Sequence, residues 1–284
     1  MASKNTFFST KTTLNCGGQL LDLRTPRVMG ILNVTPDSFF DGGKFQEESS
    51  ILFQVEKMLK EGATIIDVGA VSSRPSAPDI SENEECNRLV PAIKSICQQF
   101  PDCLISIDTF RANVARQCLD LGGHMINDIG AGRLDAEMFA TIEEFRVPYV
   151  MMHMKGLPST MQQNPEYIDV MEEVQTFFTE QLSKLNIPDV IIDPGFGFGK
   201  TVEHNYEMLN RLSEFRIHGK PVLAGVSRKS MIFKPLKINP EKALNATTAL
   251  HMMALEGGAQ ILRAHDVKEA MEAIQIQRLY HGKG

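Results

Sequence analysis

The feature that most constrains the fold is a repeated pairing of a short apolar run with a longer amphipathic stretch. In the first pair, residues 28–33 are apolar, and residues 47–60 carry Ile51, Val55 and Met58 at helical spacing. The same pairing recurs until eight units have been completed by residue 278. The runs are apolar throughout instead of alternating, which is typical of parallel strands buried on both faces. The pattern therefore predicts an α/β protein.

Eight strand-then-helix units close naturally into a barrel, whereas an open doubly wound sheet leaves two edge strands and normally has fewer units. The expected strands are residues 28–33, 64–69, 104–108, 125–128, 149–153, 190–192, 222–226 and 260–264. The expected helices are residues 47–60, 82–99, 111–121, 135–145, 166–185, 203–212, 240–256 and 267–278. Residues 12–23, with a turn at Gly17 and Gly18, predict a hairpin ahead of the barrel. We predict a (β/α)8 TIM barrel with an N-terminal β-hairpin, forming one domain over residues 1–284 with residues 1–26 as extension and hairpin.

Composition excludes several classes of function. A length of 284 residues suits one barrel, since such domains commonly run to about 250 residues. A net charge of -6 and the absence of Trp argue against a nucleic-acid or anionic-membrane surface, and no apolar run is long enough to predict a membrane span. The five cysteines include no Cys-x-x-Cys pair, so they predict free thiols in a reducing, cytoplasmic compartment.

Polar residues gather where the expected strands end, and in such barrels the carboxyl ends of the strands carry the active site. The residues concerned are Asn33, Arg74, Asp108, Asn127, Asp128, His153, Asp193, Lys229, Arg263 and His265. A lone Asp or Asn at such a position is as often a helix cap, and we assign Asp37, Asp128 and Asp135 to structural roles of this kind.

Asp108 and Asp193 differ from caps because each follows an apolar run directly, where an unpaired carboxylate would be destabilising by several kcal/mol. They require donors, which a ligand with an N–C–N edge would supply, while Asn127 can both donate and accept. The complementary set suits a phosphate or diphosphate and consists of Asn33, Arg74, Arg263 and His265.

The stretch from Asp193 to Lys200 has three glycines in five positions, but its spacing matches neither a P-loop nor a dinucleotide fingerprint. Phe196 and Phe198 in this stretch suit either the core or contact with a flat heterocycle. We expect Lys200 to be dispensable for turnover within about tenfold and His153 to be a satisfied histidine at the barrel rim. No zinc-type spacing and no Gly-x-Ser-x-Gly elbow occur, so neither a tightly held transition metal nor an acyl-enzyme serine is expected.

Taken together, these residues resemble the dihydropteroate synthase family, whose members join a dihydropterin to 4-aminobenzoate. The resemblance covers nearly the whole chain and rests on seven motifs in order. They are residues 30–39 (GILNVTPDSF), 73–75 (SRP), 106–109 (SIDT), 126–129 (INDI), 193–200 (DPGFGFGK), 227–229 (SRK) and 263–266 (RAHD). Each motif alone is weak, but the ordered set is specific.

The resemblance implies a role for each matching residue. The pterin ring would be bound by Asp108, Asn127, Asp193 and Lys229, between walls formed by Ile129, Met151, Phe198 and Gly225. The diphosphate would be held by Asn33, Arg74, Arg263 and His265, with Asn33 also near a Mg²⁺ ion. The 4-aminobenzoate would lie among Phe39, Ser73, Pro75, Lys229 and Ser230. Catalysis would depend on Asp108, Lys229, Arg263 and His265.

The implied activity is that of a transferase of folate synthesis, which condenses (7,8-dihydropterin-6-yl)methyl diphosphate with 4-aminobenzoate. The family also implies a homodimer, a Mg²⁺ cofactor and a target of sulfonamides. Residues 71–76 (VSSRPS) depart from the frequent ESTRPG of the family, which leaves sulfonamide sensitivity open. Two alternatives are a pterin-dependent methyltransferase that serves a corrinoid and a non-catalytic pterin-binding protein. Arg74 and the Arg263–His265 pair disfavour the methyltransferase, which has no diphosphate to bind.

Overall fold

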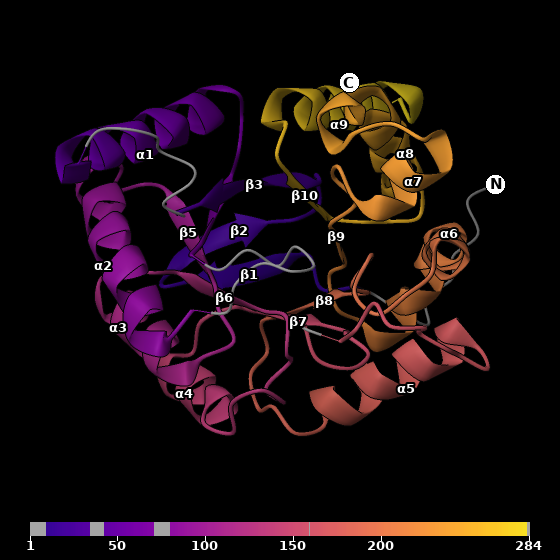
Figure 1. The fold of residues 1–284 in the computed structure, drawn as a ribbon, viewed down its shortest axis with the longest axis horizontal. Coiled ribbons are helices and arrows are strands. Elements are labelled where there is room, and N and C mark those ends of the chain that lie inside the picture. Colours follow the sequence, from indigo (N-terminus) through magenta and orange to yellow (C-terminus); the bar gives the residue numbers. More distant parts are fainter. Residues whose placement is uncertain (1–9, 35–42, 71–79, 159, 283–284) are drawn as a thin grey trace.

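The computed structural model describes residues 10–34, 43–70, 80–158 and 160–282. Its centre is a parallel barrel (Figure 1). The strands are β3 (Arg27–Asn33), β4 (Ile65–Gly69), β5 (Leu104–Asp108), β6 (Met125–Asp128), β7 (Tyr149–Met152), β8 (Val190–Asp193), β9 (Leu223–Ala224) and β10 (Ile261–Ala264). Their order is β8-β7-β6-β5-β4-β3-β10-β9, and a parallel bridge between Ile192 and Val222 closes the ring. The predicted eight-stranded TIM barrel is therefore confirmed.

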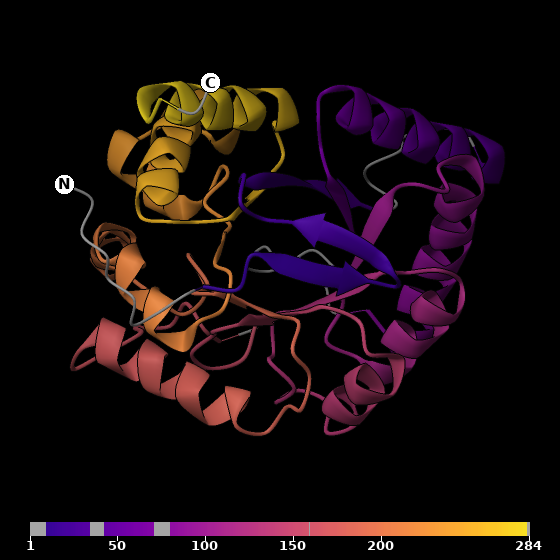
Figure 2. The ribbon, with the colours of Figure 1, turned by 180° about the vertical axis from the view of Figure 1, so that it is seen from behind.

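Helices surround the barrel on its outer side, as the view from behind also shows (Figure 2). They are α1 (Gly43–Lys60), α2 (Glu82–Gln99), α3 (Ala112–Asp120), α4 (Met138–Phe145), α5 (Val170–Leu182), α6 (Val202–Asn210), α7 (Ser230–Leu236), α8 (Leu244–Glu256) and α9 (Val267–Tyr280). The 3₁₀ helix η2 (Leu212–His218) was not predicted, and the helix expected over residues 240–256 is divided into the 3₁₀ helix η3 (Pro240–Lys242) and α8. A helix was expected to begin at Ser230, as α7 does, but its extent was not predicted. None of the helices in the described ranges is long and apolar enough to cross a lipid bilayer.

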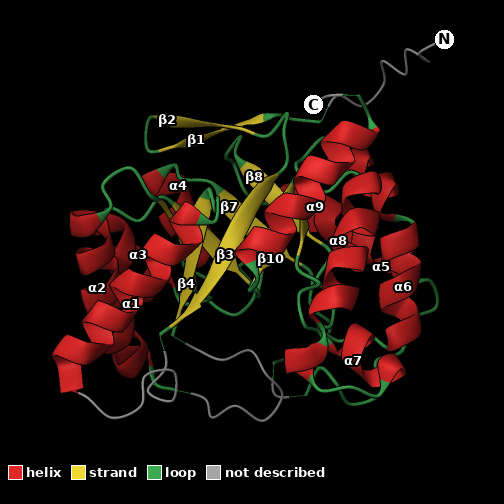
Figure 3. Cartoon of the chain, turned by 90° about the horizontal axis from the view of Figure 1, so that it is seen from above, coloured by secondary structure: helices red, strands yellow, loops and turns green. Residues whose placement is uncertain are grey.

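The predicted hairpin, β1 (Thr13–Cys16) with β2 (Gln19–Asp22), closes one end of the barrel. Leu14 and Leu21 of the hairpin belong to one buried cluster with inward-facing apolar residues of all eight barrel strands. The hairpin lies at the amino ends of the strands, opposite the end that carries α7 (Figure 3). The hairpin therefore covers the amino ends of the strands, so we expect a ligand to enter from their carboxyl ends.

Side chains that point into the barrel recur at every second residue of a strand. The residues of the apolar layer that packs on the hairpin point inward, so the residues two positions further along each strand point inward as well. In β4 and β5 this apolar layer contains Ile65 and Leu104. Two residues further along, Asp67 and Ser106 are register partners, and both are buried. The same alternation turns Asn127, Asp193 and Arg263 inward, while the intervening residues pack against the helices. The barrel thus has an apolar floor beneath a polar layer.

Candidate active site

A hydrogen-bonded network joins four strands of the polar layer. Asp67 Oδ2 accepts from Asn127 Nδ2 at 2.9 Å and from Arg263 Nε at 2.6 Å. Arg263 Nη2 donates to Asp108 Oδ2 at 2.7 Å. The structure therefore brings together three predicted site residues, Asp108, Asn127 and Arg263. It adds Asp67, which the sequence reasoning missed although an acid in the middle of an apolar strand was the available signal.

Asp108 lies at the carboxyl end of β5, where burial raises the pKa of its carboxyl group from 3.8 to about 7. Arg263 opposes this shift, whereas the negative charges of Asp67, Glu85 and Asp128 increase it. A carboxyl group with such a pKa changes charge near neutral pH and is stabilised as the anion by any donor that a ligand brings. This behaviour is typical of a functional group in a cleft.

Asp193 ends β8, and the Gly-rich loop that follows holds one of its two oxygens. The backbone N–H of Gly195 donates to Asp193 Oδ1 at 2.8 Å. Gly195 has a φ of +73°, and a Cβ built there would lie 1.9 Å from the carbonyl oxygen of His153, so only glycine fits. Burial raises the pKa of Asp193, while the charge of Lys229 lowers it. The loop thereby leaves Oδ2 as the oxygen of Asp193 available to a ligand.

Lys229 stands at the N-cap of α7 and extends toward the Gly-rich loop. Its ammonium group donates to the carbonyl oxygen of Phe196 and lies 4.6 Å from the ring centroid of Phe198. Burial lowers the pKa of Lys229 from 10.5 to about 8, although Asp193 and Asp108 raise it. Lys229 is therefore a partly buried cation, placed between the loop after β8 and the helix after β9.

The apolar wall of the site differs from prediction by one residue. Met152 clusters with Phe198, with Ile129 packed against them, whereas Met151 packs into the outer core toward the helices. The prediction that Met151 forms the pterin wall is therefore wrong, because alternation along β7 turns Met152 inward instead. Phe198 is the aromatic residue on the site side, and Phe196 is a core residue.

Gly225 lies in this wall beside Lys229 and Asp193. A Cβ built at Gly225 would lie 3.7 Å from Lys229 Nζ and 3.9 Å from Asp193 Oδ2. A larger side chain would therefore project between these two groups. A flat ring can approach the backbone at this point while it contacts the ammonium and the carboxylate.

His153 and Lys200 form a buried pair behind the Gly-rich loop. Lys200 Nζ lies 2.8 Å from His153 Nδ1, and it donates to the carbonyl oxygens of Gly195 at 3.0 Å and Phe198 at 3.1 Å. Burial lowers the pKa of both side chains well below the usual values. His153 is thus a satisfied structural histidine, as predicted, and Lys200 fixes the loop that carries Phe198.

This position gives Lys200 a role in stability, while the expectation that it is dispensable for the rate within about tenfold stays a prediction. Lys200→Met would leave two buried carbonyl oxygens and one imidazole nitrogen without their donor, so we expect a loss of about 3 kcal/mol in the free energy of unfolding. Urea denaturation of this variant measures the loss, and Lys184→Met, at an exposed position, serves as control. If both variants unfold at the same urea concentration, Lys200 does not stabilise the loop.

The remaining predicted residues lie around this centre. Asn33 and His265 are exposed at the ends of β3 and β10, and His265 Nδ1 lies 3.0 Å from Ser227 Oγ. Asp128 accepts from the Tyr149 hydroxyl at 2.6 Å, and Asp135 caps α3 through a bond of 2.7 Å from the backbone N–H of Ala112, so both have structural roles as predicted. The predicted residues Asp37, Phe39, Ser73, Arg74 and Pro75 lie outside the described residues.

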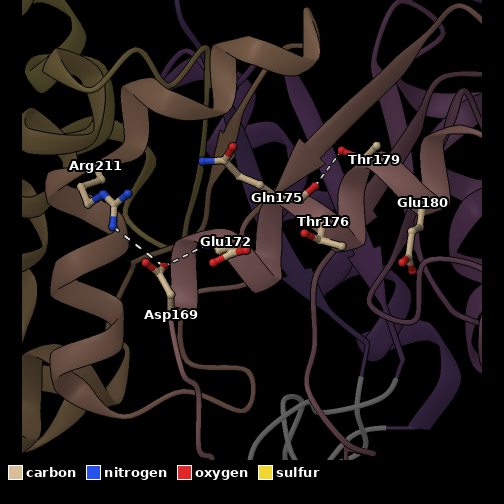
Figure 4. A pocket seen from close by; sticks show the side chains of 7 residues that line it. All are labelled: Asp169, Glu172, Gln175, Thr176, Thr179, Glu180 and Arg211. Atoms are coloured by element: carbon tan, nitrogen blue, oxygen red, sulfur yellow. Dashed lines mark hydrogen bonds and ion pairs between the residues drawn. The ribbon is translucent and has the colours of Figure 1, made fainter.

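A hollow of about 430 Å³ on the outer surface is a separate feature (Figure 4). It lies along α5 and is lined by Asp169, Glu172, Gln175, Thr176, Thr179, Glu180 and Arg211. Arg211 there is already paired with Glu207 and Glu214. This hollow contains none of the predicted site residues.

Comparisons with known proteins identify the family of the chain. Residues 29–265 match the family model described as pterin binding enzyme. The chain is 43% identical over 268 residues to the dihydropteroate synthase of Escherichia coli K12, covering 91% of this chain and 93% of the relative. It is also 43% identical to the dihydropteroate synthase of Haemophilus influenzae, covering 93% of this chain and 97% of the relative.

Solved structures of dihydropteroate synthases are similar to this chain in sequence and fold. The Yersinia pestis dihydropteroate synthase in complex with a sulfonamide drug is 40% identical, with a TM-score of 0.89 over 95% of this chain and 99% of that chain. The Xanthomonas albilineans dihydropteroate synthase with 4-aminobenzoic acid is 36% identical, with a TM-score of 0.88 over 96% of this chain and 99% of that chain. These findings favour the synthase over the methyltransferase and over a non-catalytic protein. The chain therefore belongs to the pterin-binding enzyme family, among the dihydropteroate synthases, which are transferases of folate synthesis.

Proposed function

We propose that the carboxyl end of the barrel condenses (7,8-dihydropterin-6-yl)methyl diphosphate with 4-aminobenzoate, yielding 7,8-dihydropteroate and diphosphate. The observation that carries this assignment is the polar layer itself. Two carboxylates, the half-buried Asp108 and the buried Asp193, stand with the Asn127 amide and the Lys229 ammonium above an apolar floor. A flat heterocycle with adjacent N–H donors and ring acceptors complements such a set.

The pterin ring would lie against Phe198 with its donor edge toward Asp193 Oδ2. Asn127 and Lys229 would contact the other polar atoms of the ring, and Asp108 would lie near the side that carries the reacting methylene. Ile129, Met152 and Phe198 would form the apolar walls, with Gly225 allowing close approach. In the complex, the ring supplies hydrogen-bond partners to the carboxylates of Asp108 and Asp193. Without a ligand, the protein supplies only some of these partners.

The bond that breaks joins the pterin methylene carbon to an oxygen of the diphosphate. Positive charge develops on the pterin, and the carboxylate of Asp108 is placed to stabilise it. The amine nitrogen of 4-aminobenzoate forms the new bond to the same carbon and then loses a proton to solvent. Asn33, Arg74, Arg263 and His265 would bind the departing diphosphate, whose charge the two guanidinium groups offset.

We propose Mg²⁺ as the cofactor, bound with the diphosphate at Asn33. The described residues contain no cluster of three or more His, Cys, Asp or Glu side chains that could hold a metal by themselves. This fits Mg²⁺, which is commonly bound by one or two protein oxygens together with substrate phosphates, and the exposed amide oxygen of Asn33 is a suitable ligand. When bound, Mg²⁺ would neutralise charge on the leaving diphosphate.

The 4-aminobenzoate would occupy a neighbouring pocket formed by Phe39, Ser73, Pro75, Lys229 and Ser230. The Xanthomonas relative is described with 4-aminobenzoic acid and the Yersinia relative with a sulfonamide drug. We therefore propose that sulfonamides compete at this pocket. Val71 and Ser76 replace the Glu and Gly that are frequent in the family, and inhibition by a sulfonamide measured against 4-aminobenzoate would show whether competition persists.

The two pockets share their chain segments, which predicts an order of binding. Asn33 and Phe39 follow the same strand, while Arg74 lies between Ser73 and Pro75. A diphosphate bound at Asn33 and Arg74 would thus position the residues that contact the arylamine, so 4-aminobenzoate should bind well only after it. Calorimetric titration of 4-aminobenzoate with and without Mg²⁺ and pyrophosphate measures this, and equal affinities would contradict it.

We further propose a cytoplasmic homodimer. The five cysteines are all free thiols, as a reducing compartment requires. Met253 on α8 and Ile276, Leu279 and Tyr280 on α9 are between 55% and 76% exposed. These side chains provide an apolar face for a second copy, which sedimentation of the wild type and of a Leu279→Glu variant would test.

A pyrophosphate-release assay tests the proposed activity. Release should require the dihydropterin diphosphate, 4-aminobenzoate and Mg²⁺ together. Pyrophosphate release that does not depend on 4-aminobenzoate would indicate a hydrolase. The absence of any release would indicate a pterin-binding protein without catalytic activity.

A further inference from the structure

Asp67 is a carboxylate in the centre of the site to which the proposed function gives no role. It lies in the middle of β4, is fully buried, and has Ile31 and Ser106 as its register partners on the two neighbouring strands. An ionised carboxylate in such a position is strongly destabilising unless donors surround it. Its two donors therefore indicate what Asp67 does.

The first donor is the amide of Asn127. Asn127 Nδ2 donates to Asp67 Oδ2 at 2.9 Å, so the nitrogen of this amide is engaged within the protein. A side-chain amide can present a donor or an acceptor to a ligand, depending on which way it is turned. Because Asp67 holds the nitrogen, Asn127 presents its carbonyl oxygen, which is an acceptor.

The second donor is Arg263, whose Nε donates to the same Asp67 oxygen at 2.6 Å. A guanidinium group is planar and rigid, so fixing Nε also fixes the direction of the other two nitrogens. Nη2 reaches Asp108 Oδ2 at 2.7 Å in this orientation. Asp67 thus holds the cation that stabilises the carboxylate of Asp108.

We propose that Asp67 is a positioning residue for the pterin substrate, which it serves by turning Asn127 into an acceptor and by holding Arg263 against Asp108. This inference rests on the proposed function, because Asn127 and Asp108 are the pterin contacts. Asp67 itself lies one layer below them and acts through them.

The charge of Asp67 has a consequence that a purely structural residue would not produce. Among the described residues, the charged groups that act on Asp108 include Arg263 from β10, Asp67 from β4, Glu85 from α2, Asp128 from β6 and Lys229 at the N-cap of α7. Among them Asp67 raises the pKa of Asp108, and Arg263 lowers it. Removing the negative charge of Asp67 would therefore shift the acidic limb of the pH profile, near pH 7 in the wild type, to lower pH.

Two variants separate the hydrogen bonds of Asp67 from its charge. Asp67→Ala removes the acceptor that holds Asn127 and Arg263, so we expect kcat/KM for the pterin diphosphate to fall about 10²-fold. Asp67→Asn can keep one acceptor oxygen in place and loses only the charge. We therefore expect kcat/KM for the pterin diphosphate to fall about tenfold and the acidic limb of its pH profile to move to lower pH. The KM for 4-aminobenzoate should change less than about twofold in both, since the hydrogen bonds of Asp67 in the described residues go to Asn127 and Arg263 and not to Lys229 or Ser230.

Asp189→Asn is the matched control. Asp189 is another buried aspartate, paired with Lys11 at 2.6 Å next to the amino end of β8, so its loss affects stability without touching the site. A double-mutant cycle adds Asn127→Ala, and the loss caused by Asp67→Ala should be smaller in that background, because the two residues act together.

The inference is overturned if Asp67→Asn and Asp67→Ala both match Asp189→Asn in kcat/KM, or if the two losses with Asn127→Ala simply add. If Asp67→Ala does not fold, the pH profile and pterin affinity of Asp67→Asn decide the question in the same way. A wild-type protein that forms no dihydropteroate would instead contradict the proposed function, and calorimetry with a dihydropterin would still test the role of Asp67 in binding.

Discussion

Replacing Asp193 by Asn is expected to abolish most pterin binding while the fold survives. Asp193 Oδ1 accepts the backbone N–H of Gly195 at 2.8 Å, and the oxygen of an asparagine would keep that bond. The amide nitrogen would then occupy the place of Oδ2 and point donors at the donor edge of the ring. An unpaired donor at a buried site typically costs about 2–4 kcal/mol, which corresponds to about 30- to 1000-fold weaker binding.

Isothermal calorimetry with a dihydropterin measures this loss, and circular dichroism checks the fold. Asp189→Asn is again the appropriate control, because Asp189 directly precedes the same strand at the opposite end of the barrel. Near-normal pterin affinity in a folded Asp193→Asn variant would contradict the proposal that Asp193 binds the pterin ring.

Replacing Lys229 by Ala is expected to slow turnover by about 10²-fold or more, by analogy with the loss of one preorganised donor. Lys229 is the residue that the proposal places in both substrate pockets, so both KM values should rise. Its ammonium donates to the Phe196 carbonyl and lies over the Phe198 ring, and no other cation is described at these contacts. Lys234→Ala, on the exposed face of α7, is the control and should keep wild-type turnover.

The pH dependence of kcat/KM shows whether Lys229 and Asp108 act through their charges. The pKa of Lys229 is lowered to about 8, so a rate that requires the ammonium form falls as the pH rises through 8. The pKa of Asp108 is raised to about 7, so a rate that requires its carboxylate rises as the pH passes 7. We expect a bell-shaped profile of kcat/KM whose basic limb disappears in Lys229→Ala. A basic limb that is unchanged in this variant would refute the role of Lys229.

The barrel could be predicted from sequence because its strands are short apolar runs with clear ends. The ranges expected for β5 and β6, residues 104–108 and 125–128, coincide with those observed. By contrast the extent of α7 was not predicted, since a seven-residue helix that contains Pro235 shows too little periodicity to define its bounds. Strand β9 is shorter than expected, as only Leu223 and Ala224 pair fully.

The site could be predicted as a set of residues but not as a network. Asp67 forms its bonds with residues 60 and 196 positions further along the chain, so nothing local to Asp67 indicates them. Whether Met151 or Met152 points into the barrel depends on a shift of one residue along the strand. Because the two neighbouring residues are identical, the sequence does not distinguish them. Lys200 follows a glycine in an apparent surface loop, and only the closed loop shows that its amine is buried against carbonyl oxygens.

The most direct test of the proposed activity is incubation of the purified protein with dihydropterin diphosphate, 4-aminobenzoate and Mg²⁺, followed by mass spectrometry. We expect the mass of 7,8-dihydropteroate, formed in equal amount with pyrophosphate and absent when any of the three components is omitted. Pyrophosphate without dihydropteroate, or neither product from a protein that binds the pterin normally, would contradict it.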